Sequence, residues 1–137
     1  LCTEEQSRLG LIRFLWRFIN LMGIQPDTQS CAYCGSSFTD SAFENDMFSY
    51  YNKIENIFIC PRCLSHINRE ENINAFIKIK ISGLRYLCNI TSLSPSEVRS
   101  IKISKDDYNS LRELLLFILE NSMETKLNSL ETGMGIL

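Results

Sequence analysis

The sequence predicts a mainly α-helical domain, a helical bundle with an inserted β-hairpin module that carries four cysteines. Residues 3–22 and 104–130 repeat apolar side chains with helical spacing. Between them, residues 27–66 form a loop-rich stretch with two Cys-x-x-Cys pairs. A chain of 137 residues, 45% of them hydrophobic, is long enough for one domain with a buried core.

The first helix is predicted to begin with Thr3 as its N-cap and to end before Gly23. Apolar residues occupy more than one of its faces, so we expect most of this helix to be buried in the centre of the bundle. Its polar residues Arg13, Arg17 and Asn20 form one narrow stripe, which is either solvated or paired with acids of a neighbouring helix.

The module is predicted to contain two short strands, residues 47–51 and 56–60, joined by a turn. Alternating Ile and Lys over residues 77–81 indicates a further extended segment. We expect the module itself to have almost no hydrophobic core, so that bound metal would supply its folding energy.

Three further helices are predicted from their caps. Ser82 is expected to cap a short helix over residues 83–90, and Ser94 to cap another that starts at Pro95. Ser104 is expected to cap the last helix, whose first turn is acidic. That helix should bury a long apolar stripe formed by Leu111, Leu114, Leu115, Ile118, Leu119, Met123, Leu127 and Leu130.

The four paired cysteines, Cys31, Cys34, Cys60 and Cys63, have the spacing of a structural zinc site. Each Cys-x-x-Cys turn places two sulfurs on one side of a tetrahedral centre. The gap between the pairs exceeds the usual ribbon spacing of roughly 15–20 residues, and the predicted hairpin accounts for the difference. The sequence therefore predicts a four-cysteine, zinc-ribbon-like module with one structural Zn²⁺ per chain.

Other uses of these thiols fit the sequence less well than zinc. A redox dithiol needs one Cys-x-x-Cys at a helix N-terminus in a βαβ setting, which the pattern lacks. Six cysteines without a secretory signal favour a reducing compartment over disulfides. A catalytic zinc would keep an open position, and His66 could replace a cysteine as ligand. Cys2 and Cys88 are expected to be inert thiols.

Composition and motifs limit the function. The net charge of −2 and a module with only two basic residues, Lys53 and Arg62, argue against direct phosphate binding by the module. The pattern of a Gly-rich phosphate loop is missing, and one histidine does not complete a catalytic triad, so we do not expect an enzyme. The most apolar run, residues 9–22, is too short and too polar to span a membrane.

Residues 14–35 resemble the signature of a known family, the C-terminal part of the bacterial recombination mediator RecO. In that signature an apolar helix ends in Gly, followed by Pro and by Cys-x-x-Cys-Gly. The resemblance covers residues 7–130, including a closing Lys-Leu-x-Ser-Leu pattern, while Leu15 stands where the family usually has Glu. The resemblance implies that residues 1–137 are one RecO-like C-terminal helical domain, with its zinc module at about 27–66. The matching signature residues are Phe14, Arg17, Gly23, Pro26, Cys31, Cys34 and Gly35.

The resemblance implies an N-terminal OB-fold domain outside this chain, and we expect a fragment because the sequence begins with Leu1 almost inside a helix. In the family, that domain carries much of the contact with single- and double-stranded DNA and with RecR. The helical domain helps to bind DNA and the acidic, hydrophobic tail of single-strand-binding protein. The whole protein anneals strands and helps to load recombinase without nucleotide hydrolysis, in the cytoplasm at the nucleoid.

An acidic tail needs a hydrophobic pocket beside cations. The candidates are Arg13, Arg17, Arg85 and Lys126, and for each of them a solvated surface cation is the alternative. A zinc-ribbon adaptor for transcription or ribosome-associated machinery is the second interpretation of the whole chain, and a thiol redox protein is the third.

Overall fold

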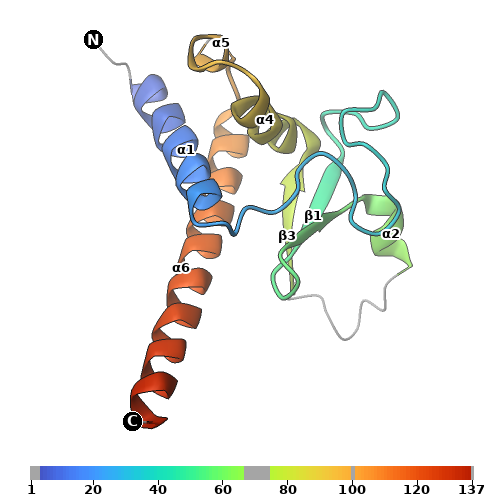
Figure 1. Ribbon diagram of the computed structural model, residues 1–137. Coiled ribbons are helices and arrows are strands. Elements are labelled where there is room, and N and C mark those ends of the chain that lie inside the picture. The colour runs from blue at the N-terminus through green and yellow to red at the C-terminus, as the bar shows by residue number, and fades with distance from the viewer. Residues whose placement is uncertain (1–3, 67–74, 100, 137) are drawn as a thin grey trace.

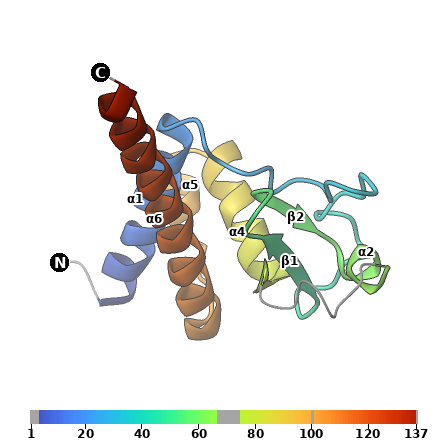
Figure 2. The same cartoon turned by 90° about the horizontal axis from the view of Figure 1, so that it is seen from below.

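The computed structural model describes residues 4–66, 75–99 and 101–136, with side chains described for residues 7–66, 75–99 and 101–124. Helices α1 and α6 lie at one side of the molecule, α4 in the middle, and a three-stranded sheet with α2 at the other side (Figures 1 and 2). The predicted fold class is confirmed. The helices are α1 (Glu4–Leu21), α2 (Pro61–Ser65), α4 (Ile81–Ser92), α5 (Pro95–Arg99) and α6 (Lys105–Ile136).

The sheet joins the predicted hairpin to the predicted extended segment. Strands β1 (Phe48–Asn52), β2 (Ile57–Ile59) and β3 (Phe76–Lys80) are antiparallel, in the order β2-β1-β3. One face of the sheet is buried toward α6, where the Tyr51 ring lies 5.3 Å from that of Phe58. The sheet is therefore a bridge between the cysteine module and the bundle.

Strand β3 runs directly into α4, and this changes how that helix begins. Its N-cap is Lys80, which makes no side-chain capping bond, so the prediction of Ser82 as cap is wrong. The first N–H groups of α4 donate to loop carbonyls instead, Ile81 to Met47 and Ser82 to Asn45. The Ser82 hydroxyl is thereby free to donate to the buried carboxylate of Asp107, at 2.5 Å.

The core of the bundle forms where α1 packs on α6 and α4. Trp16 is fully buried, and its indole N–H donates to the Thr91 hydroxyl of α4 at 3.1 Å. The expectation that most of α1 is buried is wrong, because only one of its faces is covered. Phe14, Phe18 and Leu21 are 63%, 43% and 84% exposed. Thr3, its predicted cap, lies outside the described residues.

The module also has more core than expected. Phe38 and Phe43 are buried with their rings 5.6 Å apart, and both belong to the same hydrophobic cluster as Trp16. The prediction of a module with almost no core is therefore wrong. The reason is that the loop before β1 folds back against α4, where Arg85 holds it.

Helix α6 buries the first part of its predicted stripe, in its N-terminal half. Leu111, Leu114, Leu115 and Ile118 are buried, whereas Met123 is 59% exposed. The C-terminal half extends beyond the rest of the molecule (Figure 1), and the side chains of residues 127 and 130 lie outside the described part. Within the described residues, no helix has the length and apolar character to cross a membrane.

The predicted caps of α5 and α6 are confirmed. The Glu97 N–H donates to the Ser94 hydroxyl and the Asp107 N–H to that of Ser104, the latter at 3.1 Å. We expect Ser104→Ala to lower the free energy of unfolding by about 1 kcal/mol, the usual value of an N-cap. Urea titration measures this free energy of unfolding. Ser110→Ala, inside the same helix, should not destabilise the protein, and equal losses in both variants would contradict the capping role.

Candidate metal centre and partner groove

Four cysteine sulfurs from two chain segments meet beside the sheet. The Sγ atoms of Cys31, Cys34, Cys60 and Cys63 all lie within 4.8 Å of one another. The Cys31–Cys63 and Cys34–Cys60 distances are 3.6 and 3.7 Å. A tetrahedral zinc with Zn–S bonds of about 2.3 Å requires sulfurs about 3.8 Å apart, so the cluster fits a divalent metal such as zinc.

Backbone hydrogen bonds hold the first pair in a tight turn. The Gly35 N–H donates to the Cys31 carbonyl and the Cys31 N–H to that of Ser36, both at 2.9 Å. Gly35 has a φ of +76°, a left-handed conformation that glycine adopts without strain. The second pair sits at the start of α2, and the Cys60 N–H donates to Cys31 Sγ at 3.3 Å. Each turn thus aims two sulfurs at the same point.

The surroundings shift the pKa values of these thiols in different directions. Burial raises the pKa of Cys60 and of Cys63, because a thiolate is poorly solvated there. Hydrogen bonds from the Ser36 hydroxyl and backbone lower the pKa of the exposed Cys34 to about 6. An accessible thiol of low pKa would also suit a redox protein, but the tetrahedral spacing of all four sulfurs favours metal ligation. A bound cation would stabilise all four thiolates together.

The remaining thiols and the histidine take no part in this cluster. Cys88 is buried in α4, and its thiol lies 3.1 Å from both oxygens of Thr28. His66 is exposed at the end of α2 and is not among the grouped metal-ligating side chains of the described residues. Cys2 lies outside the part of the chain that the structure describes.

A groove of about 300 Å³ lies along the uncovered face of α1. Two of the predicted cations, Arg13 and Arg17, line it together with Phe14 and Phe18, whose rings stack 6.1 Å apart. Arg99 and Pro95 of α5 form its other side. The lining residues include three arginines and no acid, so the groove combines apolar surface with positive charge. The full lining is Gly10, Arg13, Phe14, Arg17, Phe18, Leu21, Pro95 and Arg99.

Arg85 lies elsewhere and is engaged within the domain. Its guanidinium donates to the carbonyls of Phe38, Asp40 and Phe43 and to the side chain of Asn45, at 2.5–3.1 Å. These contacts give Arg85 a structural role, while its part in partner binding stays a prediction. The side chain of Lys126, the fourth predicted cation, lies outside the described part of the chain.

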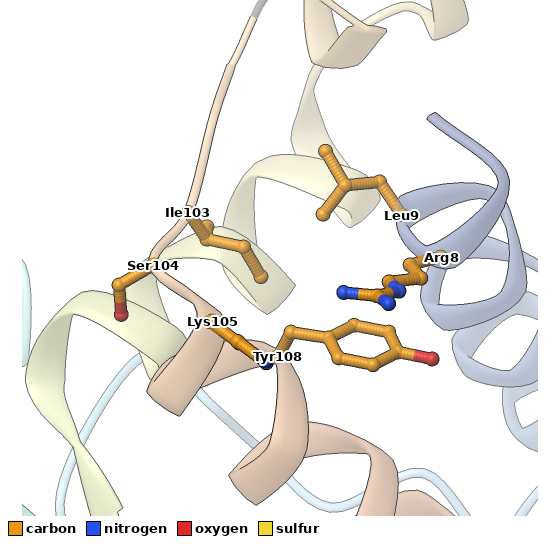
Figure 3. A pocket seen from close by; sticks show the side chains of 6 residues that line it. All are labelled: Arg8, Leu9, Ile103, Ser104, Lys105 and Tyr108. Atoms are coloured by element: carbon orange, nitrogen blue, oxygen red, sulfur yellow. The ribbon is translucent and has the colours of Figure 1, made fainter. Parts of the chain in front are cut away.

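A smaller cavity of about 220 Å³ separates the first turns of α1 and α6 (Figure 3). Leu9 and Ile103 form its apolar wall. Figure 3 shows the Arg8 guanidinium reaching over the Tyr108 ring, and its centre lies 5.9 Å from the ring centroid. We interpret this cavity as part of the contact between the two helices, since its one cation–aromatic pair links them.

Sequence reasoning found two arginines of the groove but missed its apolar floor. The signal was present: Phe14, Phe18 and Leu21 form a second apolar stripe at positions i, i+4 and i+7, beside the polar stripe. A helix with apolar residues on two faces either is surrounded by protein or exposes one face to a partner. The contribution of α5 depends on tertiary packing, and the local sequence gives no signal for it.

The chain matches a family model, "Recombination protein O C terminal", over residues 1–131. Among curated proteins it is similar to the DNA repair protein RecO of Acetivibrio thermocellus, with 26% identity over 136 residues. The alignment covers 96% of this chain and 49% of that protein, so the chain spans about half the length of the relative. No solved structure matches it significantly. Because the family model covers nearly the whole sequence, the chain belongs to the family of recombination protein O, as its C-terminal part.

Proposed function

We propose that this chain is the C-terminal domain of a recombination mediator that acts in DNA repair in the cytoplasm, and that its groove binds the tail of single-strand-binding protein. The family match and the name of the curated relative support the repair role. The whole protein would anneal DNA strands and help to load recombinase. An N-terminal OB-fold domain outside this chain would contact DNA and RecR.

The groove on α1 is the observation that supports binding of the tail of single-strand-binding protein. An acidic peptide that ends in hydrophobic residues needs an apolar surface for its side chains and cations for its carboxylates. Stacked Phe14 and Phe18 provide the first, and Arg13, Arg17 and Arg99 surround them. Exposed aromatic rings beside arginines are typical of binding hot spots. The side chain of Arg17 is exposed, so its guanidinium is accessible to a carboxylate.

We also propose that the cysteine cluster holds one structural Zn²⁺ on Cys31, Cys34, Cys60 and Cys63. Four thiolates at tetrahedral spacing leave no open position for a substrate, as expected of a structural site. The metal would fix the first cysteine turn and α2 to the edge of the sheet. This use of the cluster is compatible with a domain that binds partners without catalysing a reaction.

We expect Arg17→Glu to weaken binding of the tail peptide by about tenfold, because the charge reversal replaces an attraction for carboxylates by a repulsion. Fluorescence anisotropy with a labelled tail peptide of the organism's own single-strand-binding protein measures the dissociation constant. Phe18→Ala should weaken binding by a similar factor, because it removes one of the two stacked rings.

Arg112→Glu is the matched control, since Arg112 is exposed on α6 and does not line the groove. It should leave the affinity within about twofold of the unchanged protein, because distant surface charges are screened by salt. Equal weakening in Arg17→Glu and Arg112→Glu would mean that only net charge matters, and the groove would lose its role. Lack of any peptide binding by the unchanged protein would refute the proposal directly.

A further inference from the structure

We propose that two copies of this chain associate through their long helices, with a ridge on α6 of one copy seated in the α1 groove of the other. The ridge consists of the exposed side chains of Glu113, Leu116, Glu120 and Met123. This inference goes beyond the proposed function, since it does not depend on whether the groove also binds a peptide tail. Where the groove does bind the tail, the second copy and the tail compete for the same arginines and rings.

Exposed apolar side chains concentrate on these two helices. In the part of the chain that the structure describes, six of the eight large hydrophobic side chains that are exposed belong to α1 or α6. Both helices lie at the side of the molecule opposite to the cysteine module (Figures 1 and 2). Apolar patches rimmed by charged residues mark sites of protein interaction. The six side chains are Leu11, Phe14, Phe18 and Leu21 on α1 and Leu116 and Met123 on α6.

The ridge on α6 follows from helical spacing. Side chains three and four positions apart lie on one face of a helix, so the four ridge residues form one line along α6. Leu115 and Ile118 lie on the opposite face and are buried in the core. Leu116 and Met123, on the ridge, are 36% and 59% exposed. The ridge therefore points away from the core of its own molecule.

The ridge and the groove match in spacing. Each helix carries two exposed apolar side chains seven positions apart, about 10 Å along the helix axis, with a charged side chain between them. When α1 of one copy runs antiparallel to α6 of the other, the apolar side chains meet in pairs and the two opposite charges face each other. In this register Phe14 faces Met123, Arg17 faces Glu120, and Leu21 faces Leu116.

Charge complementarity selects a second copy as the occupant of the groove. The groove lining includes three arginines and no acid. From residue 113 to residue 124, the charged side chains of α6 are Glu113, Glu120 and Glu124, and all three are exposed. Arg112 lies at the edge of this face. The antiparallel register also brings Arg13 opposite Glu124, so two pairs of opposite charge fix the same alignment.

A twofold axis between the copies produces this antiparallel arrangement. Within one molecule α1 and α6 begin side by side, where Arg8 lies over the Tyr108 ring, and they run in the same general direction (Figure 1). A twofold axis perpendicular to both helices reverses the second copy, so α1 of each copy runs antiparallel to α6 of the other. Each copy then contributes one groove and one ridge, and the contact closes as a dimer.

The test is sedimentation velocity of the 137-residue chain over about three decades of concentration. We expect the sedimentation coefficient to rise with concentration to that of a dimer. Arg17→Glu and Glu120→Arg each place like charges face to face, so each should move the midpoint of association to at least about tenfold higher concentration. An equimolar mixture of the two variants should recover the midpoint of the unchanged protein, because both contacts of the mixed dimer then join opposite charges.

Glu44→Arg is the matched control. It reverses an exposed carboxylate in the cysteine module, outside the ridge and the groove, and should leave the midpoint within about twofold. Should a charge variant fail to fold, the salt dependence of the unchanged protein tests the same pairing. Its association should weaken as salt rises, since salt screens exposed ion pairs. Association that becomes stronger with salt would contradict the pairing.

Three results would overturn the proposal: an unchanged protein that stays monomeric over the whole range, charge variants that associate as it does, or a mixture that does not recover. Binding of the tail peptide is measured on the same samples below the midpoint. There Glu120→Arg should bind the tail within about twofold of the unchanged protein, because Glu120 lies outside the groove. Association without tail binding refutes the proposed function of the groove alone, and tail binding without association refutes the ridge alone.

Discussion

Replacing Cys60 by serine is expected to abolish metal binding and to lower the melting temperature by at least about 10 °C. Cys60 is buried, and a serine hydroxyl is a poor ligand for zinc. The free energy of metal binding contributes directly to folding, and in small zinc domains it amounts to about 10–16 kcal/mol. A loss of even a few kcal/mol shifts the melting temperature of a domain of this size by that amount. Elemental analysis should give one zinc per unchanged chain, and scanning calorimetry the shift.

The loss of order should be local. Phe38 and Phe43 belong to the shared core, and β1 is held by β3, so the sheet should survive without metal. Hydrogen exchange should become fast in the first cysteine turn, residues 31–36, and in α2, and stay slow in α6. Cys88→Ala is the control, because Cys88 contacts Thr28 and should not change the zinc content. A protein that contains no metal and still protects residues 31–36 from exchange would disprove the metal centre.

Arg85→Met is expected to lower the free energy of unfolding by about 3 kcal/mol. Arg85 donates four hydrogen bonds, three of them to backbone carbonyls of the loop before β1. A hydrogen bond to a charged group contributes about 1.5–3 kcal/mol, and carbonyls left unpaired inside the protein add a desolvation cost. Methionine keeps the apolar stem but supplies no donor. Urea denaturation followed by tryptophan fluorescence measures the change, since Trp16 is the sole tryptophan and is buried.

Two control variants separate the effect of the several N–H donors of the Arg85 guanidinium from the effect of its positive charge. Arg17→Met removes the same group from an exposed site and should cost less than about 0.5 kcal/mol. Arg85→Lys keeps the charge but lacks the planar fork, so it should recover only part of the loss. A stability of Arg85→Met equal to that of Arg17→Met would show that the loop does not depend on this residue.

The four-cysteine cluster was predictable because its geometry is local. A Cys-x-x-Cys turn fixes the direction of two sulfurs within four residues, and the hairpin between the pairs is also visible in the sequence. The same holds for Ser94 and Ser104, which bond to N–H groups three residues away. Turns and helix caps whose hydrogen bonds join residues three or four positions apart can therefore be predicted from the local sequence.

Features set by packing between distant segments were not predictable. The sequence offers Arg85 as a candidate cation for a partner, yet its contacts lie some forty residues earlier in the chain. The sequence predicts Ser82 as a cap, but the carbonyls of Met47 and Asn45 accept the first N–H groups of α4 in place of a side chain. The sequence predicts a buried second apolar face on α1, which the structure leaves exposed, because a sequence does not show how many neighbours will cover a helix.

Strand β3 has a consequence for protein engineering. Residues 27–66 transplanted alone would carry all four cysteines of the cluster without the third strand of the sheet. Strand β1 would then present an open edge to other chains, a hazard for aggregation. Tyr51 and Phe58 would also lose the helix that shields them from water. Any graft of this ribbon therefore needs to include β3 and a surrogate for α6.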